Sequence, residues 1–196
     1  MEDGDLKVLI EAVAEDAKKY LELTPRDIEA LRKAKPKIEP AIDSAVEKVA
    51  SLLREEDEMR QLAEKTGIDE AYLKSLFRSW LTDLFDSSYD ADHAYRLARI
   101  GLAHIKVPAA GRLIVLTTGA FLAELLRLAE EPREALALAK AVMWNLAIIT
   151  FIYEKVRESM YGYFVGDKSA LMERLVELFS REVEKELDHA GVPSEA

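Results

Sequence analysis

Apolar residues recur along this chain three or four positions apart, which is the spacing of amphipathic α-helices. No stretch alternates apolar and polar residues for long enough to indicate a β-strand. A first helix is expected over about Asp5 to Leu21, and its apolar face comprises Leu6, Leu9, Ile10, Val13 and Ala17. The pattern therefore predicts an all-α protein.

Helix boundaries are marked by prolines and capping residues. Thr24, Pro25 and Asp27 predict a helix start, with threonine as the cap, proline at the first helical position and an acid at the third. Pro36 and Pro40 interrupt the pattern because each lacks the amide proton that a continuing helix needs. A third helix is expected to about residue 53, and a polar helix after it is expected to end at Gly67.

The second half of the chain predicts longer helices, over about 69–85, 89–107, 108–131 and 132–164. The longest uncharged run, Ala141 to Tyr153, is too short for a bilayer, which needs about 20 residues. The last of these helices is apolar on nearly every face, so we expect a core helix that is covered on all sides. A charged amphipathic helix should follow, which predicts one domain over 1–165 and an extension over 166–196.

Composition and charge exclude several classes of function. The 196 residues are 49% hydrophobic and 33% charged, and the net charge of −10 supplies no cationic field for nucleic acid or an anionic membrane. Cysteine is absent, so disulfides, thiolate metal sites and cysteine nucleophiles are excluded. The opening MEDGDL is acidic where a signal peptide would be basic, which predicts a cytoplasmic protein.

One histidine stands out by its position on a predicted helix. At about 100° per residue, Leu97, Ile100, Gly101 and His104 share one apolar stripe, so the imidazole should point inward. A neutral imidazole is a good axial ligand for haem iron, and Gly101 would leave room for a flat group. The alternative is a core histidine bonded to a neighbouring carbonyl, and this stretch alone favours that alternative.

Other polar and aromatic residues are weaker candidates for a functional site. His93 lies eleven residues before His104, about 16 Å along the helix, so the two cannot bind one iron. We expect His93 to be a solvated residue of the first helical turn. Trp80 and Trp144 are expected to be core residues.

Three segments together resemble a known family. The first, from Tyr20 to Asp43, carries Tyr20, Leu23, Thr24, Asp27, Ile28 and Leu31. The second carries Trp80, Leu84, Phe85 and Tyr89, and the third is YDADHAYRLARIGLAHIKV, where Ile100, Gly101 and His104 match an "I-G-x-x-H" pattern. On these residues the chain is similar to the sensor globins, that is, the protoglobins and the haem domains of globin-coupled sensors.

The resemblance implies a globin-like fold with an extra N-terminal helix and a C-terminal helical extension. It implies haem b, with its iron held by His104 as the proximal metal ligand, and a diatomic gas (O2, CO or NO) as partner. It also implies a homodimer through the helices 108–131 and 132–164. The candidate haem-contacting residues, besides His104, are Val46, Val49, Ala50, Leu53, Leu73, Leu76, Phe77, Trp80, Leu97, Ile100 and Gly101.

Two departures from the family pattern bear on gas binding. The usual Phe-Tyr pair of the B helix falls on Val49 and Ala50, and alanine has no side-chain donor for bound oxygen. The aromatic residue that commonly follows the F helix is missing, and Gly111 and Arg112 lie near its place. Without a donor, we expect the site to hold CO readily and either to release O2 quickly or to oxidise.

Two further classes of function stay open. A haem-free globin-fold scaffold would fill the site with side chains and act through partner contacts. A haem enzyme would need an acid-base group, and none is visible in the sequence.

Overall fold

The computed structural model describes residues 3–105, 110–165 and 174, and its regular elements are all helices. The chain divides into two compact units, 1–156 and 157–196, and the first is described here. The expected C-terminal helix lies outside the described residues. In chain order the elements are α1 (Asp3–Leu21), α2 (Pro25–Ile38), η1 (Glu39–Ala41), α3 (Ile42–Arg54), α4 (Asp57–Thr66), α5 (Glu70–Asp86), α6 (Ala91–His104), α7 (Ala110–Leu128) and α8 (Pro132–Val165).

The predicted caps are confirmed. Thr24 is the N-cap of α2 and Pro25 its first residue, and the Asp27 carboxylate accepts hydrogen bonds from the Thr24 amide and hydroxyl. Lys140 of α8 also donates to Asp27, at 3.2 Å. Burial raises the pKa of Asp27, but the bonds from Thr24 and Lys140 outweigh it and hold that pKa below its usual value. Gly67 ends α4 with φ of 71°, a left-handed conformation that glycine adopts without strain.

The expected interruption at Pro36 is wrong. Pro36 lies inside α2, which continues to Ile38. The break falls instead on η1, a short 3₁₀ turn that contains Pro40. A proline one turn before a helix end removes one internal hydrogen bond, which a following 3₁₀ turn can accommodate.

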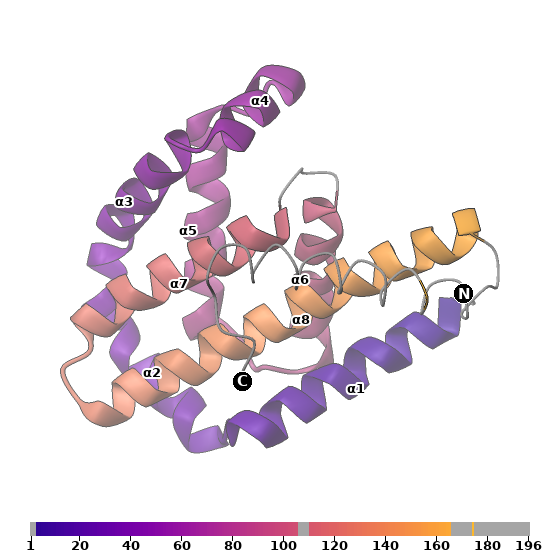
Figure 1. Cartoon of the computed structure of the whole chain (residues 1–196). Helices are drawn as coiled ribbons and strands as arrows, with labels where there is room; N and C mark the ends of the chain where they lie inside the picture. The colour runs from indigo at the N-terminus through magenta and orange to yellow at the C-terminus, as the bar shows by residue number, and fades with distance from the viewer. Residues whose placement is uncertain (1–2, 106–109, 166–173, 175–196) are drawn as a thin grey trace, which may run out of the picture. The chain divides into compact units, whose positions relative to one another are not determined.

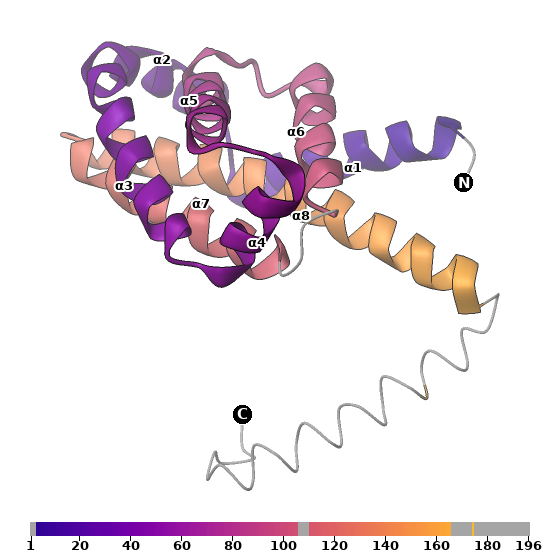
Figure 2. The ribbon, with the colours of Figure 1, turned by 90° about the horizontal axis from the view of Figure 1, so that it is seen from above.

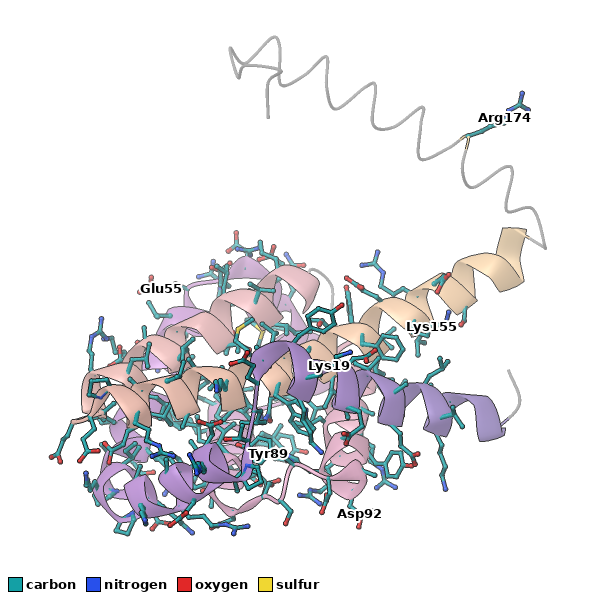
Figure 3. The ribbon with its side chains drawn as sticks, turned by 90° about the horizontal axis from the view of Figure 1, so that it is seen from below. Lys19, Glu55, Tyr89, Asp92, Lys155 and Arg174 are labelled. Atoms are coloured by element: carbon teal, nitrogen blue, oxygen red, sulfur yellow. The ribbon has the colours of Figure 1, made fainter. Side chains whose placement is uncertain are left out.

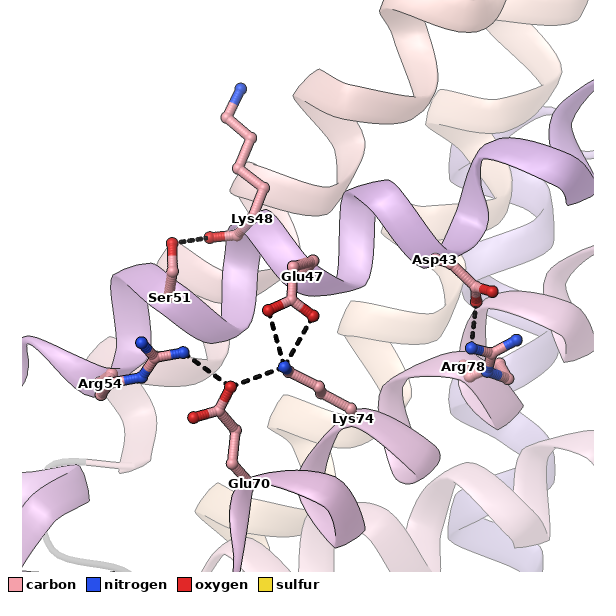
Figure 4. Close-up of polar contacts among 8 residues, drawn as sticks. All are labelled: Asp43, Glu47, Lys48, Ser51, Arg54, Glu70, Lys74 and Arg78. Atoms are coloured by element: carbon pink, nitrogen blue, oxygen red, sulfur yellow. Dashed lines mark hydrogen bonds and ion pairs between the residues drawn. The ribbon is translucent and has the colours of Figure 1, made fainter.

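Helix α3 packs against both α5 and α7 (Figures 1 and 2). Ion pairs join the exposed edges of α3 and α5 in an antiparallel register, because Asp43 pairs with Arg78, Glu47 with Lys74 and Arg54 with Glu70 (Figure 4). All of these groups except the half-buried Lys74 are exposed, so each pair stabilises the fold little. The three ion pairs show which residues of α3 and α5 lie side by side.

Helix α8 forms an antiparallel hairpin with α7, since Gly111 near the start of α7 lies against the Tyr153 ring (Figure 1). By length and composition, Pro132–Ser159 is apolar enough to cross a membrane. Its inward residues are buried as expected of a core helix, and the Trp144 indole donates to the Ala14 carbonyl of α1 at 2.9 Å. Within one chain its faces are not all covered, because Leu136 and Met143 are exposed.

An aromatic cluster fills the interior at the connection between α5 and α6. Tyr89, labelled in Figure 3, is fully buried, and its hydroxyl donates to the Leu84 carbonyl at 2.6 Å. The Tyr89 ring meets the rings of His93 and Trp144 at centroid distances of 5.2 and 5.1 Å. The cluster joins the start of α6 to α8, on which α1 also packs through Trp144.

Candidate functional site

His104 is the last residue of α6, and its side chain is half-buried rather than fully inward. Its Nδ1 lies 2.8 Å from the Ile100 carbonyl oxygen, one turn earlier. A carbonyl oxygen can only accept, so this bond places the ring proton on Nδ1 and leaves the Nε2 lone pair available. Such a bond orients an imidazole that ligates a metal and raises its basicity. The residue therefore fits a haem ligand.

Gly101 has a different role from the one expected. A Cβ at Gly101 would lie 2.5 Å from the Ile149 backbone oxygen and 3.2 Å from the Ile152 Cβ. Both residues belong to α8, so the missing side chain admits α8 rather than a flat group. Leu97, one turn earlier on the same stripe, is buried in the core. Ile100 and His104, the other two residues of the predicted stripe, are half-buried and keep part of their surface accessible.

The candidate residues on α3 form a buried apolar surface. Val46, Val49, Ala50 and Leu53 are at most 8% exposed, and none of these side chains can donate a hydrogen bond. Helix α3 packs most extensively on α5 and α7.

The candidate residues on α5 divide between two faces. Leu73, Phe77 and Trp80 are half-buried, whereas Leu76 is 47% exposed. The Phe77 and Trp80 rings lie 5.1 and 5.7 Å from the ring of Phe121 on α7.

The Trp80 indole N–H is already used in a bond. It donates to the Asn145 Oδ1 at 3.0 Å, and Asn145 Nδ2 donates to the Ala141 carbonyl at 2.9 Å. Asn145 is fully buried, and it was not among the residues expected at the site. An amide within the apolar run AVMWNLAIIT was the signal that could have identified it.

Leu73 and His104 lie at similar distances along α5 and α6 from the connection between the two helices. Helices α5 and α6 run in opposite directions, joined by residues 87–90 (Figure 1). Leu73 lies 13 residues before the last residue of α5, and His104 lies 13 residues after the first residue of α6. At 1.5 Å per residue both are about 20 Å from the connection. Both residues therefore lie far along their helices from residues 87–90.

His93 was expected to be solvated, and this expectation is wrong. It is 1% exposed, and neither ring nitrogen has a hydrogen-bond partner among the described residues. Burial, with a contribution from the Arg96 charge, lowers the pKa of His93 from 6.5 to about 4, despite the opposing carboxylates of Asp83 and Asp90. The neutral imidazole is therefore a core group of the aromatic cluster.

The helix order, the α3–α5–α7 packing and a histidine at the end of α6 define an all-α protein with a globin-like fold. A family model described as Protoglobin matches residues 11–159, three quarters of the chain, and the chain belongs to this family. The family is one of haem-binding, gas-binding proteins of globin type. A search of curated proteins finds no match.

Proposed function

We propose that the protein binds one haem b per chain through Nε2 of His104 and holds a diatomic gas (O2, CO or NO) on the opposite side. The observation that carries this proposal is the bond between His104 Nδ1 and the Ile100 carbonyl, which selects the tautomer with a free Nε2. When bound, haem iron supplies the coordination position for the gas. The chain itself supplies orientation of the imidazole and an apolar surface that excludes water.

The candidate distal residues belong to α3 and α5: Val46, Val49, Ala50, Leu53, Leu73, Leu76, Phe77 and Trp80. Their side chains offer no free donor, since Trp80 is bonded to Asn145. Tyr72, a hydroxyl-bearing residue of α5, is 55% exposed. An apolar surface of this kind suits small uncharged ligands.

The test is a haem titration of three proteins. We expect the unsubstituted chain to give a Soret band that saturates at one haem per chain, and His104→Ala to lose tight binding and regain the band with added imidazole. His93→Leu, which removes the other imidazole of α6, should bind haem as the unsubstituted chain does. Equal haem affinity of His104→Ala and the unsubstituted protein would contradict the proposal.

A haem-free scaffold is the second candidate. The observation that favours it is the close covering of α3, where Val46, Val49 and Ala50 are each at most 2% exposed. In that case side chains of α5 and α7 fill the site, and the protein acts through contacts with a partner. Failure of the unsubstituted chain to bind haem would support this candidate over the first.

We further propose that the protein acts as a homodimer through α7 and α8 and reports gas binding to a partner. Support comes from the apolar side chains that these two helices expose, which are Val115, Leu116, Leu126, Leu136 and Met143. Exposed apolar surface of this extent is typical of an interface. The cytoplasmic location stays a prediction.

A further inference from the structure

The imidazole of His93 is buried without any hydrogen-bond partner. Among the described residues, the buried side-chain nitrogens and oxygens that lack a partner are its Nδ1 and Nε2. The side chain is 1% exposed, so bulk solvent does not reach it. It also lies about 16 Å along α6 from His104, outside the candidate haem site. A buried polar group without a partner is costly, and here it calls for an explanation other than haem binding.

Aromatic rings enclose the His93 imidazole. The ring centroids of Trp144 on α8 and of Tyr89 before α6 lie 5.0 and 5.2 Å from it. Tyr89, labelled in Figure 3, has φ of 56°, a left-handed conformation that bulky residues rarely adopt. Such backbone strain persists only where the surrounding packing holds it. Opening of the cluster would therefore also let the Tyr89 backbone relax.

The charged groups of α5 and α6 around His93 are engaged elsewhere. Asp83 of α5 pairs with Arg96 at 3.5 Å, and Asp90 accepts from the His93 backbone amide at 3.0 Å. Neither carboxylate bonds to the His93 ring. Burial and the Arg96 charge both disfavour the protonated ring, and they outweigh the two carboxylates.

The other two helices present uncharged groups to the cluster. Helix α8 contributes the Trp144 ring, whose indole N–H donates to the Ala14 carbonyl of α1 at 2.9 Å. Lys140, one turn before Trp144, is paired with Asp27 of α2. The acidic residues of α1 on either side of Ala14 in the sequence are exposed: Glu11, Glu15 and Asp16. A proton on His93 would thus lack an acceptor within the closed cluster.

Helix α1 rests on both of the helices that meet in this cluster. It packs along α6, where the Tyr95 hydroxyl donates to the Glu11 carboxylate. It is also bonded to α8 through the indole of Trp144. His93 of α6 and Trp144 of α8 are in direct ring contact, so this contact holds together the two helices on which α1 rests. Separation of the two rings would therefore loosen α1.

We propose that the cluster of Tyr89, His93 and Trp144 is an acid-sensitive latch that holds α1 on α6 and α8. A protonated His93 cannot stay in the closed cluster, because a buried charge without a partner is strongly disfavoured. The ring reaches solvent by moving away from Trp144, and this movement detaches α1 while α3 stays packed on α5 and α7. In mild acid α1 should thus open before the rest of the first unit unfolds. The latch acts whether or not haem is bound.

Hydrogen–deuterium exchange of the full chain tests the latch. Burial holds the pKa of His93 at about 4 in the closed cluster, against about 6.5 for an exposed ring, so opening of α1 should become about twentyfold more frequent between pH 7 and pH 5. This factor applies after correction for the intrinsic exchange rate. At pH 5 the α1 amides should exchange faster than those of α3 and depend only weakly on added urea, which marks a local opening.

Two variants separate the titrating group from the attachment. His93→Leu should keep α1 as closed at pH 5 as at pH 7. Trp144→Phe keeps an aromatic ring but removes the bond to Ala14, so α1 should open more often at both pH values and keep the twentyfold dependence on pH. Equal pH dependence of α1 opening in His93→Leu and the unsubstituted chain would overturn the latch.

A measurement on the unsubstituted protein needs no variant to fold. The NMR signals of the His93 ring, followed from pH 7 to pH 4, should show a neutral imidazole as long as the α1 amides are protected. A His93 ring that is protonated while α1 stays protected would contradict the proposal. So would α1 amides that exchange together with those of α3, because opening would then be global unfolding.

Discussion

His93 and His104 lie on one helix, yet their surroundings give them opposite properties. His93 is enclosed by the rings of Tyr89 and Trp144 and has no partner for either nitrogen. His104 is half-buried, and its Nδ1 bonds to its own helix. Burial disfavours the charged imidazolium, so His93 stays neutral in the folded protein. Of these two histidines, His104 is the one with part of its side chain exposed to solvent.

The buried His93 predicts a loss of stability in mild acid. Its pKa is about 4 in the folded protein and about 6.5 when unfolded, so the unfolded chain takes up a proton first as the pH falls. Its contribution is therefore present above pH 6.5 and is lost between about pH 6.5 and 4. The free energy of unfolding should fall by up to about 1.4 kcal/mol per pH unit, and by roughly 3 kcal/mol in all.

Urea denaturation of the haem-free protein between pH 7 and 4.5 measures this effect. His93→Leu has a similar volume and no titrating group, so its stability should depend less steeply on pH. The two proteins are compared by the slope of their unfolding free energy against pH. Because both contain the same carboxylates, the difference between the slopes reports His93 alone. Identical slopes would show that His93 takes up its proton as readily in the folded as in the unfolded protein.

At the scale of elements, the approach of α6 to α8 depends on Gly101. Its missing side chain lets the Ile149 backbone come closer than any Cβ would allow. The crossing matters for the site because His104 lies one turn further along α6. Helix packing at this point therefore sets where His104 lies.

Gly101→Ala should destabilise the protein by about 1 to 3 kcal/mol, the cost of inserting an atom into a packed core. Gly119→Ala on α7 is the matched control, because a Cβ there meets nothing within 4 Å. Glycine is a poor helix former, so this control should stabilise the protein by up to about 1 kcal/mol. Urea denaturation at one protein concentration measures the stability change of each variant. A similar change in the two variants would contradict the packing role of Gly101.

At the scale of the whole molecule, the exposed apolar side chains gather on α7 and α8 more than elsewhere in the described part of the chain. Val115, Leu116 and Leu126 on α7 and Leu136 and Met143 on α8 are each more than a third exposed. These two helices form a hairpin, and a twofold axis would pair it with its copy.

Sedimentation at micromolar concentration should therefore show a dimer. Leu116→Glu on α7 places a charge in the proposed interface and should shift the protein to a monomer. Leu52→Glu on α3 is a control of similar exposure, 51% against 54%, on a helix outside the interface. A monomeric unsubstituted protein, or equal dissociation of the two variants, would argue against this interface.

The amino-acid sequence by itself determined the helices, their caps and the histidine at the end of α6. These features are local: Thr24 caps its own helix, Gly67 relieves its own backbone, and His104 bonds to Ile100 one turn away. Local features follow from residue types and their spacing, so they can be predicted without the fold.

The tertiary structure alone decided which residues are enclosed by other helices and which polar groups are already hydrogen-bonded. The periodicity of α6 could not show that Gly101 faces α8 or that His93 is enclosed by Trp144, because both depend on residues more than forty positions away. The same holds for Trp80, whose indole N–H donates to Asn145 of α8. Burial and pairing are properties of neighbours brought together by folding, and a single helix does not contain them.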